Sequence, residues 1–68
     1  MRKEITLKKA REDAGFTQQY MADELGVSRP TYINIENDPT KASVLQARRI
    51  CNILGRSYEH IFFGRNVS

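Results

Sequence analysis

The chain has 68 residues, of which 11 are basic and 8 acidic, and its formal net charge at pH 7 is +3. So short a chain supports one small domain with a single core and leaves little room for a deep substrate pocket. It has no run near the ~18 apolar residues of a membrane span, no secretory signal and a single cysteine. We therefore expect a cytoplasmic protein with no membrane contact, metal or disulfide.

The first two segments between glycines have the apolar spacing of helices. In residues 6–14 an inward stripe recurs at i, i+3, i+4 and i+7, and consists of Leu7, Ala10, Arg11 and Ala14. Thr17 is placed to cap a second helix. Its inward stripe consists of Gln18, Met21, Ala22 and Leu25.

The second helix stops abruptly at Gly26, because glycine readily adopts the left-handed conformation that ends a helix. Val27 is an apolar residue that packs between the helices, and Ser28 is placed to cap a third helix. The small Ala22 lets the two helix axes cross closely. Two short helices joined by so tight a turn are typical of a helix-turn-helix.

The third helix carries Arg29 and Pro30 in its first turn, where the missing N–H of proline costs little. Its inward residues are Tyr32 and Ile35, and residues 37–40 (Asn-Asp-Pro-Thr) have the composition of a turn.

Two further helices are predicted. One runs from about Ser43 to Gly55, with Val44, Ala47, Ile50, Cys51 and Leu54 inward. Ser57 caps a short fifth helix, with Tyr58, Ile61 and Phe62 inward. No strand alternation persists, so we expect an all-α, compact five-helix domain over residues 1–68, with its core in 6–63 and a tail at 64–68.

Three stretches carry a resemblance to a known family: "LKKAREDAGFTQ", "MADELGVSRPTYINIEN" and "LGRSYEHIFFG". Residues 7–63 resemble the lambda-repressor-like, Cro/C1-type (Xre) helix-turn-helix family of bacterial and phage repressors. The resemblance implies a five-helix domain of a bacterial or phage-infected cell that binds operator DNA in the major groove, usually as a symmetric dimer. Two features depart from the family pattern. Tyr32 replaces a smaller aliphatic residue, so its hydroxyl must reach the surface or find a partner. The loop after Glu36 reads Asn-Asp-Pro where the family commonly has Asn-Gly and a basic residue.

The outward face of the third helix supplies the candidate base contacts. At about 100° per residue, this face holds Pro30, Ile33, Asn34 and Asn37, with Arg29 to the side. Arg29 suits a guanine edge, Asn34 an adenine and Ile33 a thymine methyl group. We therefore predict base contacts from Arg29, Pro30, Ile33 and Asn34. The alternatives are contact with phosphate or water for Arg29, and an ordinary surface position for Ile33.

Phosphate contacts are expected from a second set of side chains. Gln18 matches the family glutamine that binds the DNA backbone, and its amide lies at a helix N-terminus with partial positive charge. The alternative is a capping or core-edge glutamine. The other candidates are Ser28, Thr31, Asn37 and Lys41.

Arg11 requires a partner, because it lies on the apolar stripe of the first helix, where an unpaired charge is costly. Glu36 falls near the inner edge of the third helix. We expect the two to form a structural ion pair, as the matching family positions do.

No catalytic constellation is visible, and we expect neither an enzyme nor a cofactor or small-molecule ligand. His60 and Cys51 do not suggest a dyad, and Cys51 is interpreted as a core residue. We predict a sequence-specific, double-stranded-DNA-binding transcriptional regulator: a repressor that acts on operator DNA as a homodimer. Dimerisation through the fifth helix and the tail would use Phe63 and Val67, with a frayed terminus as the alternative. The alternative function is an antitoxin-like or other protein-interaction module with the same fold.

Overall fold

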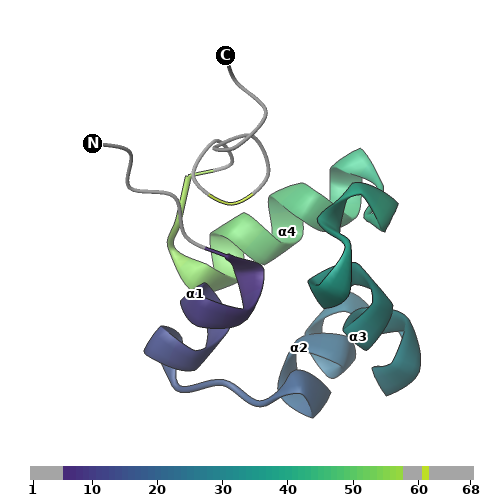
Figure 1. Cartoon of the computed structure of the whole chain (residues 1–68), viewed down its shortest axis with the longest axis horizontal. Helices are drawn as coiled ribbons and strands as arrows, with labels where there is room; N and C mark the ends of the chain where they lie inside the picture. The colour runs from purple at the N-terminus through teal and green to yellow at the C-terminus, as the bar shows by residue number, and fades with distance from the viewer. Residues whose placement is uncertain (1–5, 58–60, 62–68) are drawn as a thin grey trace.

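A computed structural model describes residues 6–57 and residue 61 of the chain (Figure 1). Its elements are α1 (Leu7–Ala14), α2 (Gln18–Leu25), α3 (Arg29–Asn37), the 3-10 turn η1 (Pro39–Lys41) and α4 (Val44–Leu54). Within these residues the chain forms helices and no strand, which confirms the all-α class. The predicted fifth helix, with Tyr58 and Phe62, and the tail, with Phe63 and Val67, lie outside the described residues. Ile61 is described and is buried.

A serine or threonine caps each α-helix of the described region at its N-terminus. Thr17 accepts a hydrogen bond from the backbone N–H of Tyr20 at 3.0 Å, and Ser28 accepts from that of Thr31 at 3.3 Å. Ser43 and the side chain of Gln46 form a reciprocal capping box. The caps predicted at Thr17 and Ser28 are therefore confirmed. The first helix begins one residue later than expected, since Thr6 is its cap.

The turn between α2 and α3 depends on Gly26, whose φ of 72° lies in the left-handed region. The N–H groups of Gly26 and Val27 donate to the carbonyls of Asp23 and Ala22 at 3.2 and 3.0 Å and close the end of α2. Val27 is half-buried against the core, and Ala22 is fully buried. These contacts confirm the predicted break and turn.

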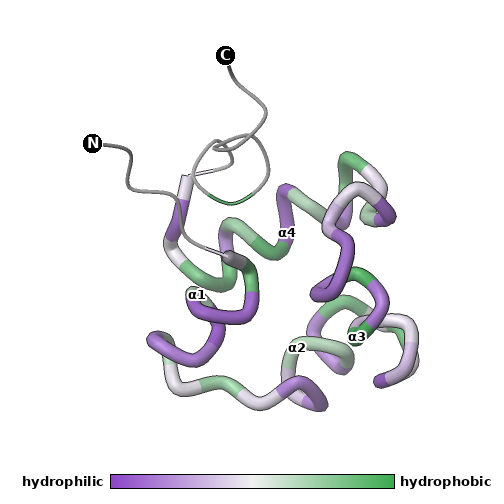
Figure 2. Tube along the Cα trace, viewed as in Figure 1, coloured by the Kyte–Doolittle hydropathy of each residue, from purple (hydrophilic) through white to green (hydrophobic). Residues whose placement is uncertain are grey.

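One apolar core joins all four α-helices of the described region. Its buried members are Leu7, Ala10, Met21, Ala22, Tyr32, Ile35, Ile50, Cys51, Leu54 and Ile61. In Figure 2, apolar segments are interspersed with polar segments along the helices, as expected for helices with one buried face. Cys51 is a core residue, as predicted.

The predicted inward positions were wrong at Ala14, which is exposed, and at Val44, which is 67% exposed. Both lie at helix ends. Side chains on a helix lean toward its N-terminus, so a side chain in the first turn, such as that of Val44, projects past the packed part of the helix. Helical periodicity identifies the inward direction but not how far along the helix the core extends.

The helices are arranged so that α2 packs chiefly on α3, while α4 contacts α1 and α2 (Figure 1). The segment predicted as a turn after α3 forms η1, where Asp38 accepts hydrogen bonds from the N–H and the hydroxyl of Thr40 at 3.2 and 2.6 Å. The hydrogen bond from the Thr40 hydroxyl lowers the pKa of the Asp38 carboxyl most, and the bond from the Thr40 N–H lowers it further. The result is a compact connection that carries Lys41 directly after α3.

Candidate nucleic-acid interface

One side of α3 is anchored in the core and the other side is exposed. Tyr32 and Ile35 are 0% and 2% exposed, whereas the opposite side is polar. The exposed residues of α3 are Arg29, Pro30, Thr31, Asn34 and Asn37. A helix anchored on one side with a polar, exposed opposite side has the form needed to dock against another molecule.

Ile33, predicted on the outward face of α3, is half-buried. At about 100° per residue it lies roughly 130° from the inward direction, on one flank of the helix rather than at the centre of its outward face. Asn34, on the opposite flank, is exposed. Ile33 can still present part of its side chain to a partner.

Arg29 and Asn34 have side chains that are free to take new partners. Neither side chain forms a hydrogen bond or an ion pair with another residue in the described part of the chain. Arginine and asparagine are the residue types that make bidentate contacts to guanine and adenine edges. Both therefore have the chemistry and the accessibility that base reading requires.

At the start of α3, two hydroxyl groups are linked. The Ser28 hydroxyl donates to Thr31 Oγ1 at 2.9 Å and also accepts from the Thr31 N–H. Each hydroxyl has one proton and the two share one hydrogen bond, so one of the two protons stays available for an outside acceptor such as a phosphate. Asn37 and Lys41 are exposed at the other end of α3 and in η1.

Gln18, the first residue of α2, is half-buried and points into the protein. Its Nε2 donates to Glu36 Oε1 at 2.9 Å. The structure thus places Gln18 at the edge of the core, which was the alternative to a phosphate contact. A primary amide has two N–H donors, so the second remains chemically capable of reaching a phosphate.

The structure brings Arg11 and Glu36 together across 25 residues of sequence, and both are buried. Arg11 Nε donates to Glu36 Oε2 at 2.6 Å, and Arg11 Nη2 donates to Oε1 at 3.3 Å. The third Arg11 contact goes from Nη1 to the Phe16 carbonyl at 2.8 Å. The guanidinium is therefore satisfied on all three nitrogens.

Tyr32 adds a member to this network that the sequence reasoning missed. Its hydroxyl donates to Glu36 Oε2 at 2.9 Å. The departure from the family pattern at position 32 indicated that such a partner exists, since the hydroxyl of a buried tyrosine needs a hydrogen-bond partner.

The network keeps Glu36 ionised and Tyr32 neutral. Burial alone would raise the pKa of Glu36, but hydrogen bonds from Arg11, Gln18 and Tyr32 outweigh burial and hold that pKa below its ordinary value. Burial, followed by the hydrogen bond to Glu36, raises the pKa of the Tyr32 phenol well above its usual range. The hydrogen bond to Glu36 raises the pKa of Arg11. In these charge states the Arg11 guanidinium and the Tyr32 hydroxyl both donate to an ionised carboxylate.

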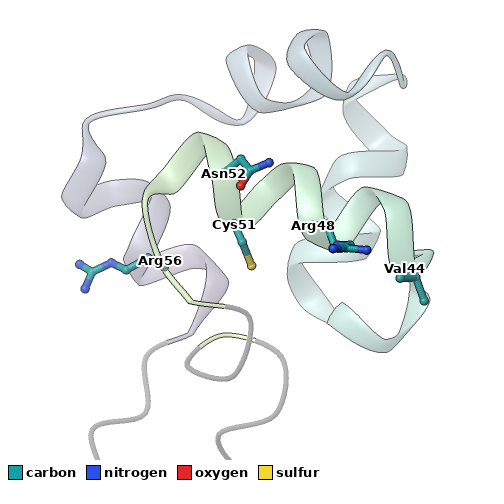
Figure 3. Close-up of a pocket in the computed structure, with 5 residues that line it drawn as sticks. All are labelled: Val44, Arg48, Cys51, Asn52 and Arg56. Carbon is teal, nitrogen blue, oxygen red and sulfur yellow. The ribbon is translucent and has the colours of Figure 1, made fainter.

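A hollow of about 520 Å³ lies along α4 (Figure 3). Its lining residues are Val44, Arg48, Cys51, Asn52 and Arg56. Burial raises the pKa of the Cys51 thiol, so the thiol is protonated at neutral pH. Among the described residues there is no group of three or more side chains suited to hold a metal ion, and no helix long and apolar enough to cross a membrane.

Comparison with known proteins gives consistent matches. The sequence pattern of a family described as helix-turn-helix matches residues 7–61. An uncharacterized HTH-type transcriptional regulator of Methanothermobacter thermautotrophicus is 38% identical over 55 residues, which cover 81% of this chain and 77% of that protein.

Two proteins of Bacillus subtilis also match. The uncharacterized HTH-type transcriptional regulator YqaE is 37% identical over 88% of this chain, and the SPbeta prophage-derived uncharacterized HTH-type transcriptional regulator YonR is 36% identical over 90%. The chain spans 52% and 56% of their lengths. No solved structure gives a significant match.

Proposed function

The chain belongs to the Cro/C1-type helix-turn-helix family, and from this membership we propose that it is a sequence-specific transcriptional regulator that binds double-stranded DNA. In this proposal α3 enters the major groove. Arg29, Pro30, Ile33 and Asn34 face base edges, and Gln18, Ser28, Thr31, Asn37 and Lys41 lie toward the phosphates.

The observation that carries this proposal is the contrast between the two sides of α3. The inner side is fixed by Tyr32, Ile35 and the ion-paired Glu36, whereas Arg29 and Asn34 on the outer side have no partner among the described residues. Side chains that read bases must be accessible and must also be held by a rigid element. The helix meets both conditions.

We further propose that the protein is a repressor that acts in the cytoplasm and occupies operator DNA as a homodimer. A dimer would read two half-sites about 34 Å apart. In this proposal residues 1–68 form one DNA-binding domain, and the dimer contact uses the fifth helix and the tail. Those segments lie outside the described residues. The family resemblance and the apolar Phe63 and Val67 of the tail support this part of the proposal.

A second candidate function is a protein-interaction module. It is favoured by two large aliphatic side chains at the start of α4, Val44 and Leu45, which are 67% and 68% exposed. An interaction module would bind DNA weakly and without sequence preference. Selection of preferred duplexes from a random pool separates the two candidate functions.

The test is selection of preferred duplexes from a random pool with the wild-type chain and three variants. We expect wild type to select one motif, and Arg29→Ala and Asn34→Ala each to relax it at one position, since a bidentate contact supplies about 1–3 kcal/mol of discrimination. Arg48→Ala is the matched control, because Arg48 is exposed on α4 and has no partner among the described residues. Equal binding of all duplexes by wild type would overturn the proposal, and an unchanged motif in both α3 variants would overturn the assignment of the reading residues.

A further inference from the structure

Glu36 accepts hydrogen bonds at every lone-pair site of its carboxylate. Oε2 accepts from Arg11 Nε at 2.6 Å and from the Tyr32 hydroxyl at 2.9 Å. Oε1 accepts from Gln18 Nε2 at 2.9 Å and from Arg11 Nη2 at 3.3 Å. An ionised carboxylate has about four such sites, two on each oxygen, so the group has no acceptor site left.

The donors come from three helices that meet at this carboxylate. Arg11 belongs to α1, Gln18 begins α2, and Tyr32 lies one turn before Glu36 within α3 itself. Glu36 is in the last turn of α3. Because the carboxylate is tied to α1 and α2 at once, it opposes rotation of α3 about its own axis.

The rotation of α3 determines where its outward side chains lie. At an outer radius of about 5–6 Å, a rotation of about 10° moves the tip of a side chain by about 1 Å. Hydrogen bonds to base edges span a donor–acceptor range of only about half an ångström. A small rotation of α3 is therefore enough to lose contacts from Arg29 and Asn34.

We propose that Tyr32 is a positioning residue for DNA recognition: its hydroxyl fills the last acceptor site of Glu36 and so fixes the rotation of α3 and the amide of Gln18. This inference rests on the proposed DNA-binding function and deepens it. Without the hydroxyl, Glu36 keeps its ion pair with Arg11 but has an open acceptor site on Oε2. The carboxylate can then shift, and α3 and Gln18 shift with it.

A different role is that Tyr32 only fills volume in the core, where its side chain is fully buried. Tyr32→Phe separates the two roles, since phenylalanine keeps the ring and removes only the hydroxyl. Tyr20→Phe is the matched control. Tyr20 is 40% exposed, its ring stacks at 4.5 Å on that of Phe16, and its hydroxyl has no partner within the described ranges.

The first measurement is the Kd of each protein for the duplex selected by wild type and for an unrelated duplex, at a temperature where circular dichroism shows all three proteins folded. We expect Tyr32→Phe to bind the selected duplex about five- to tenfold more weakly, because α3 and the Gln18 amide must be brought back into the binding orientation when the duplex binds. Binding to the unrelated duplex should change by less than about twofold, since it depends on phosphate contacts. Tyr20→Phe should match wild type on both.

The second measurement is the titration of the Glu36 carboxyl in the free proteins, followed by carbon-13 NMR. The pKa of Glu36 should be higher in Tyr32→Phe than in wild type and Tyr20→Phe, because one donor that favours the ionised form is gone. A role in filling volume would not move this pKa.

An unchanged ratio of specific to unrelated binding in Tyr32→Phe would overturn the positioning role. So would loss of folding in that variant, since the hydroxyl would then serve stability. If instead the proposed function is wrong, the wild-type protein will bind the two duplexes with the same Kd.

Discussion

Removing the carboxylate of Glu36 should destabilise the domain severely. In Glu36→Ala the Arg11 guanidinium, 8% exposed in the intact protein, keeps only the Phe16 carbonyl as a partner. Breaking one side of a buried ion pair costs about 3–5 kcal/mol. A 68-residue domain has a total stability of about 3–10 kcal/mol at the usual stability per residue. We therefore expect the variant to be largely unfolded or to melt far below wild type.

The assay is urea unfolding followed by circular dichroism at pH 7. Lys9→Ala is the control, because Lys9 forms an exposed i,i+4 pair with Asp13 at 3.4 Å, and such a pair contributes less than about 1 kcal/mol. The double variant Arg11→Met/Glu36→Met should recover part of the loss, since it removes both buried charges. If Glu36→Ala costs no more than Lys9→Ala, the reasoning that the buried pair holds α3 against α1 is wrong.

Three further predictions follow from local geometry and ionisation. The folded pKa of Glu36 lies below its unfolded value of about 4.3. The contribution of Glu36 to stability is therefore present above that value and is lost as pH falls through the folded pKa. Urea unfolding between pH 2 and 7 should show this loss in wild type and much less of it in Glu36→Gln. Gly26→Ala should lower the free energy of unfolding by about 1–2 kcal/mol through the positive φ of 72° alone, since an added Cβ meets nothing within 4 Å, and a thermal melt that matches wild type would contradict this. Cys51, buried and with a raised pKa, should react with a maleimide far more slowly in the folded chain than in urea, which a timed labelling experiment measures.

Features that depend on near neighbours in sequence were predicted well. The caps at Thr17 and Ser28 and the break at Gly26 rest on hydrogen bonds and dihedral angles within about four residues of each position, so the sequence specifies them directly. The errors at Ala14 and Val44 have a common origin. Helical periodicity gives a direction around the axis, but exposure depends on where the neighbouring helices end.

In the candidate site, too, some features follow from the local sequence and others only from the packing of the helices. The exposed side chains of Arg29 and Asn34 follow from the phase of one helix, which the sequence alone determined. The sequence also required a partner for Arg11, since a charge on an apolar stripe cannot remain unpaired.

Only the tertiary structure decided that this partner, Glu36, is shared with Gln18 and with Tyr32. Arg11 and Gln18 are 25 and 18 residues away from Glu36, and their donors reach it because of the way α1 and α2 pack against α3. Packing of this kind is a sum over many weak contacts between distant segments, and no pattern of local spacing encodes which polar groups it will bring together.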